Sequence, residues 1–315
     1  MYDLIIIGSG PAGMTSAIYA SRREMKTLVI GKELGGQVVW ASEIENYPGF
    51  KTISNYDFIS KTAEQVKALG VEIKTDEVSK IIKNEDGTFT LFTNKDELQA
   101  KTVIIAMGLA PRRLAIPGEQ EFNGKGVSYC ANCDGPFYKG KTVAVIGGGN
   151  AALDAAEVLS KIASQVYLIH RNENFKAFDV LVDEVKSKNN IEMVLNSDIK
   201  EITGTNKVEK IKILNNQNQA EREIAVDGVF VEVGRIASTD LVKDFVDLDE
   251  RSQIFVDEKF MTKTQGIFAA GDVVHGEFKQ ITIACGQATI AALSAYQFLQ
   301  LKQGKSTVVV MDRSH

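Results

Sequence analysis

Residues 2–13 of the chain read Tyr-Asp-Leu-Ile-Ile-Ile-Gly-Ser-Gly-Pro-Ala-Gly, and this stretch decides the fold. Its apolar run indicates a buried strand, and its three glycines have the spacing of a tight turn that opens a helix. A helix-forming segment at residues 14–23 and an apolar segment at residues 27–30 follow. The stretch therefore predicts a strand, a glycine turn, a helix and a return strand, which is the unit that binds dinucleotides.

The same pattern occurs a second time. Residues 142–152 read Thr-Val-Ala-Val-Ile-Gly-Gly-Gly-Asn-Ala-Ala, and a helix-forming segment and another strand-like segment come next. Strands that alternate with helices are typical of parallel sheets with helices on their faces. We therefore predict an α/β fold with two Rossmann-like, doubly wound nucleotide-binding domains.

The end of the chain indicates how the two domains share the sequence. Residues 267–272 read Ile-Phe-Ala-Ala-Gly-Asp and precede a long predicted helix at residues 281–299. This strand, turn and helix would complete the first domain, so we predict that the second domain is inserted into the first. The expected boundaries are residues 1–116 with 243–315 for the first domain and residues 117–242 for the second.

Two further segments carry local signals. Residues 54–69 predict an amphipathic helix, with Ser54 as its N-cap and Gly70 as its end. Residues 71–92 alternate as short strands, and residues 308–311 form a β-like run that we leave unassigned.

The composition is that of an ordinary globular protein. The chain has 315 residues, of which 44% are hydrophobic and 24% charged. A net charge of −5 offers no basic surface of the kind that binds nucleic acid. The N-terminus lacks the features of a secretion signal, and no apolar run reaches the roughly 18 residues of a membrane span. We therefore expect a cytoplasmic protein without a nucleic-acid or membrane partner.

A pair of cysteines lies just before the second glycine turn. Cys130 and Cys133 have the C-x-x-C spacing, which allows a disulfide to close and reopen and often lowers the pKa of one thiol. Asp134 follows directly and offers a carboxyl group for proton transfer. The sequence therefore indicates a redox dithiol.

The cysteines allow two other interpretations, a zinc site and a pair of inert buried thiols. A zinc site needs four ligands, and Cys285 and three histidines do not provide the spacing of one, so no metal is expected. Two inert buried thiols remain an alternative for the pair. Cys285 itself is expected to be a small core residue.

Taken together, these motifs resemble the low-molecular-weight thioredoxin reductases, which are FAD-dependent pyridine nucleotide–disulfide oxidoreductases. The resemblance extends over essentially the whole chain, and the order and spacing of its motifs make it specific. The matching segments are residues 8–13, 35–37, 45–49, 130–135, 147–150, 271–272 and 279–280.

The resemblance implies that the first domain binds FAD. The residues assigned to it lie in the first glycine turn, in the turns that follow and around the last strand: Gly8, Gly10, Pro11, Ala12, Gly13, Gly36, Gln37, Asn46, Gly108, Gly271, Asp272, Lys279, Gln280 and Ile281. An acidic residue after the return strand commonly binds the ribose hydroxyls. Glu33 is the candidate, and a plain surface carboxylate is the alternative.

The second domain is expected to bind NADPH, with NADH as the other possibility. The assigned residues are Gly147, Gly149, Asn150, Ala151, Arg171 and Lys176. Asn172 stands where the family has its second basic residue, Lys176 stands where it has its third, and a threonine is common at the position of Ala151. We therefore expect a preference for NADPH that is weaker than usual for the family.

The resemblance also implies roles and partners. Cys133 is expected to face the flavin, Cys130 to attack the disulfide of a partner protein, and Asp134 to assist as an acid. The expected partner is thioredoxin or a thioredoxin-like small protein, and the expected assembly is a homodimer. Electrons would pass from NADPH through FAD and the dithiol to that protein.

Two alternatives stay open. One is a flavin dithiol oxidoreductase that uses ferredoxin or oxygen, which is expected to lose the second glycine turn; that turn is intact here. The other is a non-catalytic nucleotide-binding redox sensor, which would need no dithiol beside a flavin.

Overall fold

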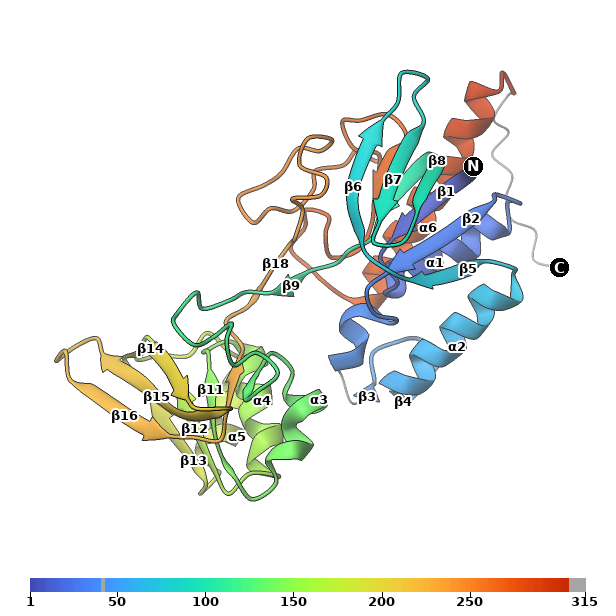
Figure 1. Cartoon of the computed structure of the whole chain (residues 1–315). Helices are drawn as coiled ribbons and strands as arrows, with labels where there is room; N and C mark the ends of the chain where they lie inside the picture. Colours follow the sequence, from blue (N-terminus) through green and yellow to red (C-terminus); the bar gives the residue numbers. More distant parts are fainter. Residues whose placement is uncertain (41–42, 306–315) are drawn as a thin grey trace. The chain divides into compact units, whose positions relative to one another are not determined.

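The computed structural model describes residues 1–40 and 43–305, which divide into two compact units (Figure 1). The first unit consists of Met1–Ala110 together with the chain from Ile236 onward, and the second consists of Pro111–Arg235. The chain enters and leaves the second unit once each. The predicted insertion of one domain into the other is therefore confirmed.

Both boundaries lie earlier in the chain than the sequence suggested. The units meet after residues 110 and 235, whereas the expected boundaries followed residues 116 and 242. Leu114 and Ile116 pack on the hydrophobic core of the second unit. Ala237 and Val242 are buried in a core of the first unit. Packing of these apolar side chains therefore shifts both boundaries, and the unassigned run at residues 308–311 lies outside the described residues.

The first unit is built on a seven-stranded sheet with the order β5-β2-β1-β8-β7-β6, in which β19 also pairs with β8. The strands are β1 (Tyr2–Ile7), β2 (Thr27–Gly31), β5 (Glu72–Thr75), β6 (Val78–Lys83), β7 (Phe89–Thr93), β8 (Glu97–Ile105) and β19 (Ile267–Ala269). Strands β5, β2, β1, β8 and β19 pair in parallel, and β6 and β7 pair antiparallel.

Strand β1 explains why the first apolar run has no polar interruption. Leu4 and Ile6 belong to the core on one face of the sheet, and Ile5 and Ile7 belong to the core on the other face. A parallel strand covered on both faces needs apolar side chains at every position. The first of these cores is shared with helices α1 (Pro11–Ser21), α2 (Asn55–Ala68) and α6 (Ile281–Lys302).

Short elements complete the first unit: η1 (Gly36–Trp40), β3 (Glu43–Ile44) and β4 (Ile53–Ser54). Ser54 caps α2 as predicted, because its hydroxyl oxygen accepts the backbone N–H of Asp57 at 3.0 Å.

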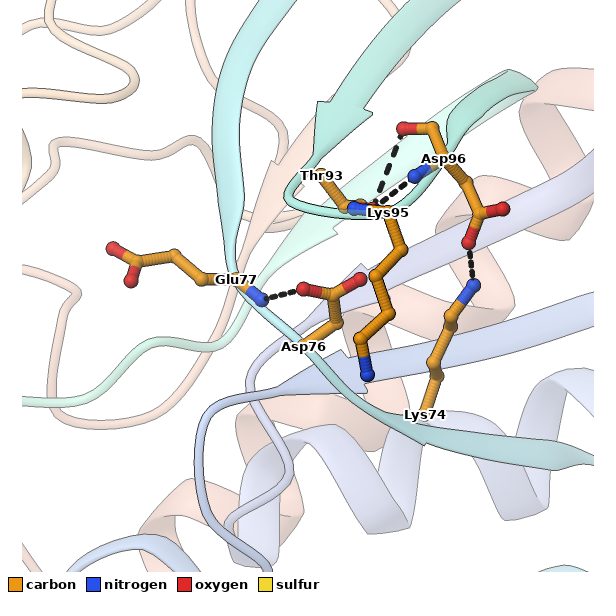
Figure 2. Close-up of polar contacts among 6 residues, drawn as sticks. All are labelled: Lys74, Asp76, Glu77, Thr93, Lys95 and Asp96. Carbon is orange, nitrogen blue, oxygen red and sulfur yellow. Dashed lines mark hydrogen bonds and ion pairs between the residues drawn. The ribbon is translucent and has the colours of Figure 1, made fainter.

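Polar contacts fix the chain where it leaves β5 (Figure 2). Asp76 is buried, and its carboxylate accepts the backbone N–H of Glu77 at 2.8 Å. Lys74 forms an ion pair with Asp96, which lies in the turn between β7 and β8. Burial raises the pKa of Asp76, but hydrogen bonds and the charge of Lys95 outweigh this and leave the pKa below its ordinary value. The crossing from β5 to β6 is thereby tied to the β7–β8 turn.

The second unit is built on a five-stranded parallel sheet with the order β10-β17-β11-β12-β13. Its strands are β10 (Val127–Ser128), β11 (Thr142–Ile146), β12 (Gln165–Ile169), β13 (Ile191–Val194) and β17 (Gly228–Val231). Its helices are α3 (Ala131–Asp134), η2 (Gly135–Tyr138), α4 (Asn150–Ser160) and α5 (Asp179–Lys186).

Further strands were not expected from the sequence. An antiparallel sheet consists of β14 (Ser197–Gly204), β15 (Val208–Asn215) and β16 (Glu221–Ala225). Its apolar side chains join the core that lies under one face of the parallel sheet. The short strands β9 (Ala110–Pro111) and β18 (Arg235–Ile236) pair where the chain passes between the units.

The two parallel sheets correspond strand by strand. The order β5-β2-β1-β8-β19 in the first unit matches β13-β12-β11-β17-β10 in the second. In each unit the strand order reverses beside the strand that carries the glycine turn, β1 or β11. The crevice at the carboxyl ends of strands at such a switch point is where open α/β sheets bind ligands.

A buried carboxylate stabilises the segment that enters the second unit. Glu119 is 3% exposed. Its oxygens accept the backbone N–H groups of Leu114 at 2.8 Å and Ala115 at 2.7 Å, and the hydroxyl of Tyr129 at 2.9 Å. Burial together with the hydrogen bond and charge of Glu119 raises the pKa of Tyr129 to about 12.

We predict that Glu119→Ala lowers the free energy of unfolding by about 2 kcal/mol, because the partly buried N–H groups of Leu114 and Ala115 lose their acceptor. Chemical denaturation of the purified protein measures this loss. Glu121→Ala is the matched control, since Glu121 is exposed and its removal should change stability by less than about 0.5 kcal/mol. Equal stabilities of the two variants would contradict this account of Glu119.

Candidate functional site

The first glycine turn brings backbone close to backbone. Gly8 has a φ of +117° and its N–H donates to the carbonyl of Ile30 at 2.7 Å. A Cβ at Gly8 would lie 2.1 Å from the carbonyl oxygen of Ala106, and a Cβ at Gly13 would lie 1.8 Å from that of Gly8. In contrast, a Cβ at Gly10 would meet nothing nearer than 3.7 Å. The side of Gly10 is therefore open to a ligand.

The return strand β2 is tied back to this turn. The hydroxyl of Ser9 donates to the carbonyl of Glu33 at 2.7 Å, and the N–H of Gly35 donates to the carbonyl of Ser9 at 2.9 Å. A Cβ at Gly36 would lie 3.1 Å from the Cα of Gly10. The side chain of Glu33 is exposed. The turns at residues 8–13 and 33–36 therefore form one continuous backbone surface.

Amide and carboxylate side chains from distant segments meet beside this surface. Gln37 Nε2 donates to Asp272 Oδ2 at 2.9 Å, and a Cβ at Gly108 would lie 3.4 Å from the same amide nitrogen. Asn46 Nδ2 donates to Gln280 Oε1 at 3.2 Å. The predicted residues thus form two hydrogen-bonded pairs, and Gly108 lies beside one of them.

The turn after β19 packs on the start of α1. A Cβ at Gly271 would lie 2.8 Å from the Cβ of Ala12, which follows Pro11 in the first turn of α1. The N–H of Gly271 donates to Gln287 Oε1 at 2.9 Å. Ile281 is the first residue of α6 and packs on a small core that includes Val38 and Phe58. The starts of α1 and α6 are therefore held together.

Lys279 and His275 belong to the loop that precedes α6. Lys279 Nζ donates to the carbonyl of Val274 at 2.5 Å. Burial lowers the pKa of Lys279, against the charges of Asp272 and Asp249, which raise it. His275 Nδ1 lies 2.8 Å from Asp249 Oδ2. These contacts order the loop that carries Asp272.

Aligned backbone donors and an open glycine are what a pyrophosphate needs. The first N–H groups of α1 have no partner within the helix and suit anionic oxygens. A pocket along the turn is lined by Ser9, Gly10, Pro11, Gly35 and Phe58, among others. The residues of the first unit thus fit a dinucleotide cofactor such as FAD.

The second glycine turn repeats the first. Gly147 has a φ of +151°, its N–H donates to the carbonyl of Ile169 at 3.0 Å, and a Cβ there would lie 2.2 Å from the carbonyl oxygen of Glu232. Gly149 is the N-cap of α4, and a Cβ on it would approach only Lys176 O, at 3.8 Å. As at Gly10, the open side of Gly149 can receive a phosphate.

The basic segment after β12 folds against this turn. A Cβ at Gly148 would lie 2.2 Å from the ring of His170, and the N–H of Lys176 donates to the carbonyl of Gly148 at 2.7 Å. Burial lowers the pKa of His170, and the positive charges of Arg171 and Lys176 act in the same direction. Both predicted cations therefore lie beside the second turn.

The start of α4 holds the remaining residues predicted for the nucleotide. Asn150 Oδ1 accepts the N–H of Phe178, the N-cap of α5, at 2.9 Å. Ala151 is exposed at the first turn of α4. Asn150 therefore joins the basic segment to the helix that begins at the glycine turn.

Cys130 and Cys133 form a disulfide in the second unit. Cys130 is 8% exposed and is the N-cap of α3, where its sulfur accepts the N–H of Cys133 at 3.1 Å. Cys133 is exposed, and Asp134 ends α3 with its N–H donating to the carbonyl of Cys130 at 3.2 Å. Cys285 is a free, half-buried cysteine in α6 of the first unit.

Two other kinds of feature, a metal site and a membrane-spanning helix, are absent from the described parts of the chain. Among residues 1–40 and 43–305, no three His, Cys, Asp or Glu side chains are grouped so as to hold a metal ion. Across the same residues, no helix combines the length and apolar character that a bilayer crossing requires.

Some residues of these sites were not predicted. Gln287 lies on the expected last helix, but no motif marks it. Glu232 looks like a surface carboxylate in the sequence. The internal repeat carries a signal for it, because Glu232 follows β17 as Ala106 follows β8, and both face the first glycine of a turn.

Comparison with known proteins agrees with this geometry. The family model described as pyridine nucleotide-disulphide oxidoreductase matches residues 2–288. A 34.2 kDa protein in the rubredoxin operon of Clostridium pasteurianum is 40% identical, covering 94% of this chain and 97% of the relative. Thioredoxin reductase of Treponema pallidum is 38% identical, covering 96% of this chain and 98% of the relative.

Solved structures point to the same group. The crystal structure of Lactococcus lactis thioredoxin reductase has a TM-score of 0.87 and 39% identity, covering 95% of this chain and 99% of that structure. FAD and NADPH, the two cofactors expected from the sequence, are those that this family uses. The chain belongs to the pyridine nucleotide-disulphide oxidoreductases and, within them, to the low-molecular-weight thioredoxin reductases.

Proposed function

We propose that the chain reduces the disulfide of thioredoxin or a thioredoxin-like small protein, with electrons from NADPH that pass through FAD and the Cys130–Cys133 pair. One observation carries the proposal. The chain has two glycine turns of the same geometry, and the second unit also carries a C-x-x-C disulfide. We further propose that the enzyme is a cytoplasmic homodimer.

The first unit is proposed to bind FAD. Gly10 leaves room for the pyrophosphate, and the N–H groups at the start of α1 donate to it. The amides of Gln37, Asn46 and Gln280 offer hydrogen bonds for the ribityl chain and ring, and Glu33 offers a carboxylate for the ribose. The open Gly10 and the paired amides support this assignment.

The second unit is proposed to bind NADPH. The N–H groups at the start of α4 would donate to its pyrophosphate beside Gly149. Arg171 and Lys176 would bind the 2′-phosphate, since both follow β12, where the adenosine ribose of a Rossmann unit lies. The electrostatic effect of both cations on His170 supports this role.

Bound FAD would accept a hydride from NADPH and pass two electrons to the disulfide. Reduction breaks the S–S bond and leaves two thiols. Asp134 would take the proton of the Cys130 thiol, and the resulting thiolate would attack the partner disulfide to form a mixed disulfide. Asp134 would then return that proton to the partner's leaving sulfur. Attack by Cys133 on Cys130 re-forms the internal disulfide and releases the reduced partner. Because Cys130 is buried in the disulfide form, this attack requires its exposure after reduction.

We predict that the purified protein is yellow and carries about one FAD per chain. Gly10→Ala should weaken FAD binding about tenfold or more, because a methyl group enters the space proposed for the pyrophosphate. Flavin absorbance after dialysis measures the loss. The control is Gly286→Ala, which adds a methyl group at an exposed position in the second turn of α6, where a Cβ would meet nothing within 4 Å. A folded, colourless wild type, or one with FMN, would contradict the FAD assignment.

We predict that Cys130→Ser and Cys133→Ser each abolish thioredoxin reduction and still permit flavin reduction by NADPH. Exchange needs both sulfurs, whereas hydride transfer to the flavin needs neither. Stopped-flow absorbance follows the flavin, and a coupled assay follows thioredoxin. Cys285→Ser, which removes the free cysteine, should retain both reactions. Substantial thioredoxin reduction by either variant of the pair would rule out the dithiol role.

We predict a preference for NADPH over NADH in kcat/KM of roughly tenfold, which corresponds to one good charge-assisted contact. Asn172→Arg should increase the preference by restoring the second basic position of the segment. Asn206→Arg makes the same change in the exposed turn between β14 and β15 of the same unit and should leave the ratio unchanged. Equal efficiency with NADH in the wild type would refute the preference. A flavin that neither nucleotide reduces would favour the ferredoxin or oxygen alternative.

A further inference from the structure

The topology of the second unit assigns the two halves of a bound dinucleotide to different strands. The glycine turn follows β11, with β12 on one side of it and β17 on the other. A dinucleotide crosses the carboxyl ends of such strands at the switch point. If the adenosine lies over the end of β12, near Arg171, the nicotinamide lies toward the end of β17. Glu232 is the first residue after β17.

The first unit has no glutamate at the position that Glu232 holds in the second unit. Gly8 in the first unit faces the carbonyl oxygen of Ala106, and Gly147 in the second faces that of Glu232. Ala106 and Glu232 therefore hold equivalent positions, after β8 and after β17. The first unit has an alanine at this position of the chain, and the second has a glutamate. Next to a turn that suits an anionic pyrophosphate, a carboxylate is unfavourable unless it serves another part of the ligand.

The surroundings of Glu232 give it an unusual charge state. Burial raises its pKa to about 7, with the charge of Arg235 opposing and that of Asp154 supporting the rise. Asp154 lies on α4, one turn beyond Asn150. Its own pKa is raised by burial and by the charges of Glu157 and Glu184. Two partly desolvated carboxyl groups thus lie near the start of α4.

We propose that Glu232, assisted by Asp154, discriminates between the two redox states of the nicotinamide and favours the oxidised one. The inference rests on the proposed binding of NADPH to the second unit. Loss of a hydride leaves the nicotinamide ring with one positive charge, which an ionised carboxylate attracts. The reduced ring is neutral and gains nothing from that charge. Tighter binding of the oxidised ring also favours hydride donation by the bound nucleotide.

Equilibrium binding to the oxidised holoenzyme tests this proposal, by calorimetry with two ligands. NADP+ carries the positive ring, and tetrahydro-NADP carries an uncharged ring that cannot donate hydride. Both share the pyrophosphate and the 2′-phosphate, so the ratio of their Kd values isolates the ring. In the wild type, Kd(NADP+)/Kd(tetrahydro-NADP) should fall about fivefold from about pH 6, where Glu232 is mostly protonated, to about pH 8.5, where it is ionised.

Three variants sharpen the test. In Glu232→Gln, which keeps the shape and removes the charge, the ratio should stay at the wild-type low-pH value throughout. At about pH 8.5, where Glu232 is ionised in either case, Asp154→Asn should raise the ratio as Glu232→Gln does, by a smaller factor. Glu223→Gln removes an exposed carboxylate of the same unit and should behave like the wild type. A Glu232→Gln ratio equal to the wild-type ratio at about pH 8.5 overturns the inference alone. Failure of the wild type to bind either ligand overturns the proposed function itself.

Discussion

The structure depends on one steric constraint, which is the contact between a strand-to-helix turn and the carbonyl of a neighbouring strand. At Gly8 and at Gly147 the backbone approaches a carbonyl oxygen so closely that any Cβ would collide with it. The same approach directs the following helix so that its first N–H groups face the crevice at the switch point. Each unit thus requires a glycine, which has no Cβ, at the first position of its turn. Gly10 and Gly149 lie two residues after these glycines, and in both turns the space beside them is open.

This constraint also explains what the sequence could predict. Glycine turns, the apolar strands β1 and β11, and the cysteine pair are visible because no other residues satisfy their steric or chemical requirements. The insertion of one domain into the other followed from the position of the last strand. The strands β14 to β16 and the exact domain boundaries were missed, since they depend on where side chains such as Leu114 and Val242 find a core.

The candidate sites were predictable to a similar degree. Gln37 contacts Asp272 and Asn46 contacts Gln280 in the first unit, and the four residues could be named from the sequence because they belong to motifs with fixed spacing. Gln287 and Glu232 were not predicted, because no sequence motif marks them. Each is an ordinary polar residue within a helix or after a strand, and only its neighbours in space give it meaning. Burial and charge environment are properties of the folded chain that no local pattern encodes.

The paired strands β9 and β18 have a consequence for how the chain folds. The N–H of Arg112 donates to the carbonyl of Gly234 at 2.9 Å, so the inserted unit begins and ends at one point. Once that unit has folded, it therefore acts within the first unit as a tight loop, although it contains many residues. The entropy of joining β8 to β19 is then that of a loop made only of the first unit's own residues, because the two ends of the insertion are already together. An insertion of this kind can be gained or exchanged as a module with little disturbance to the sheet that receives it.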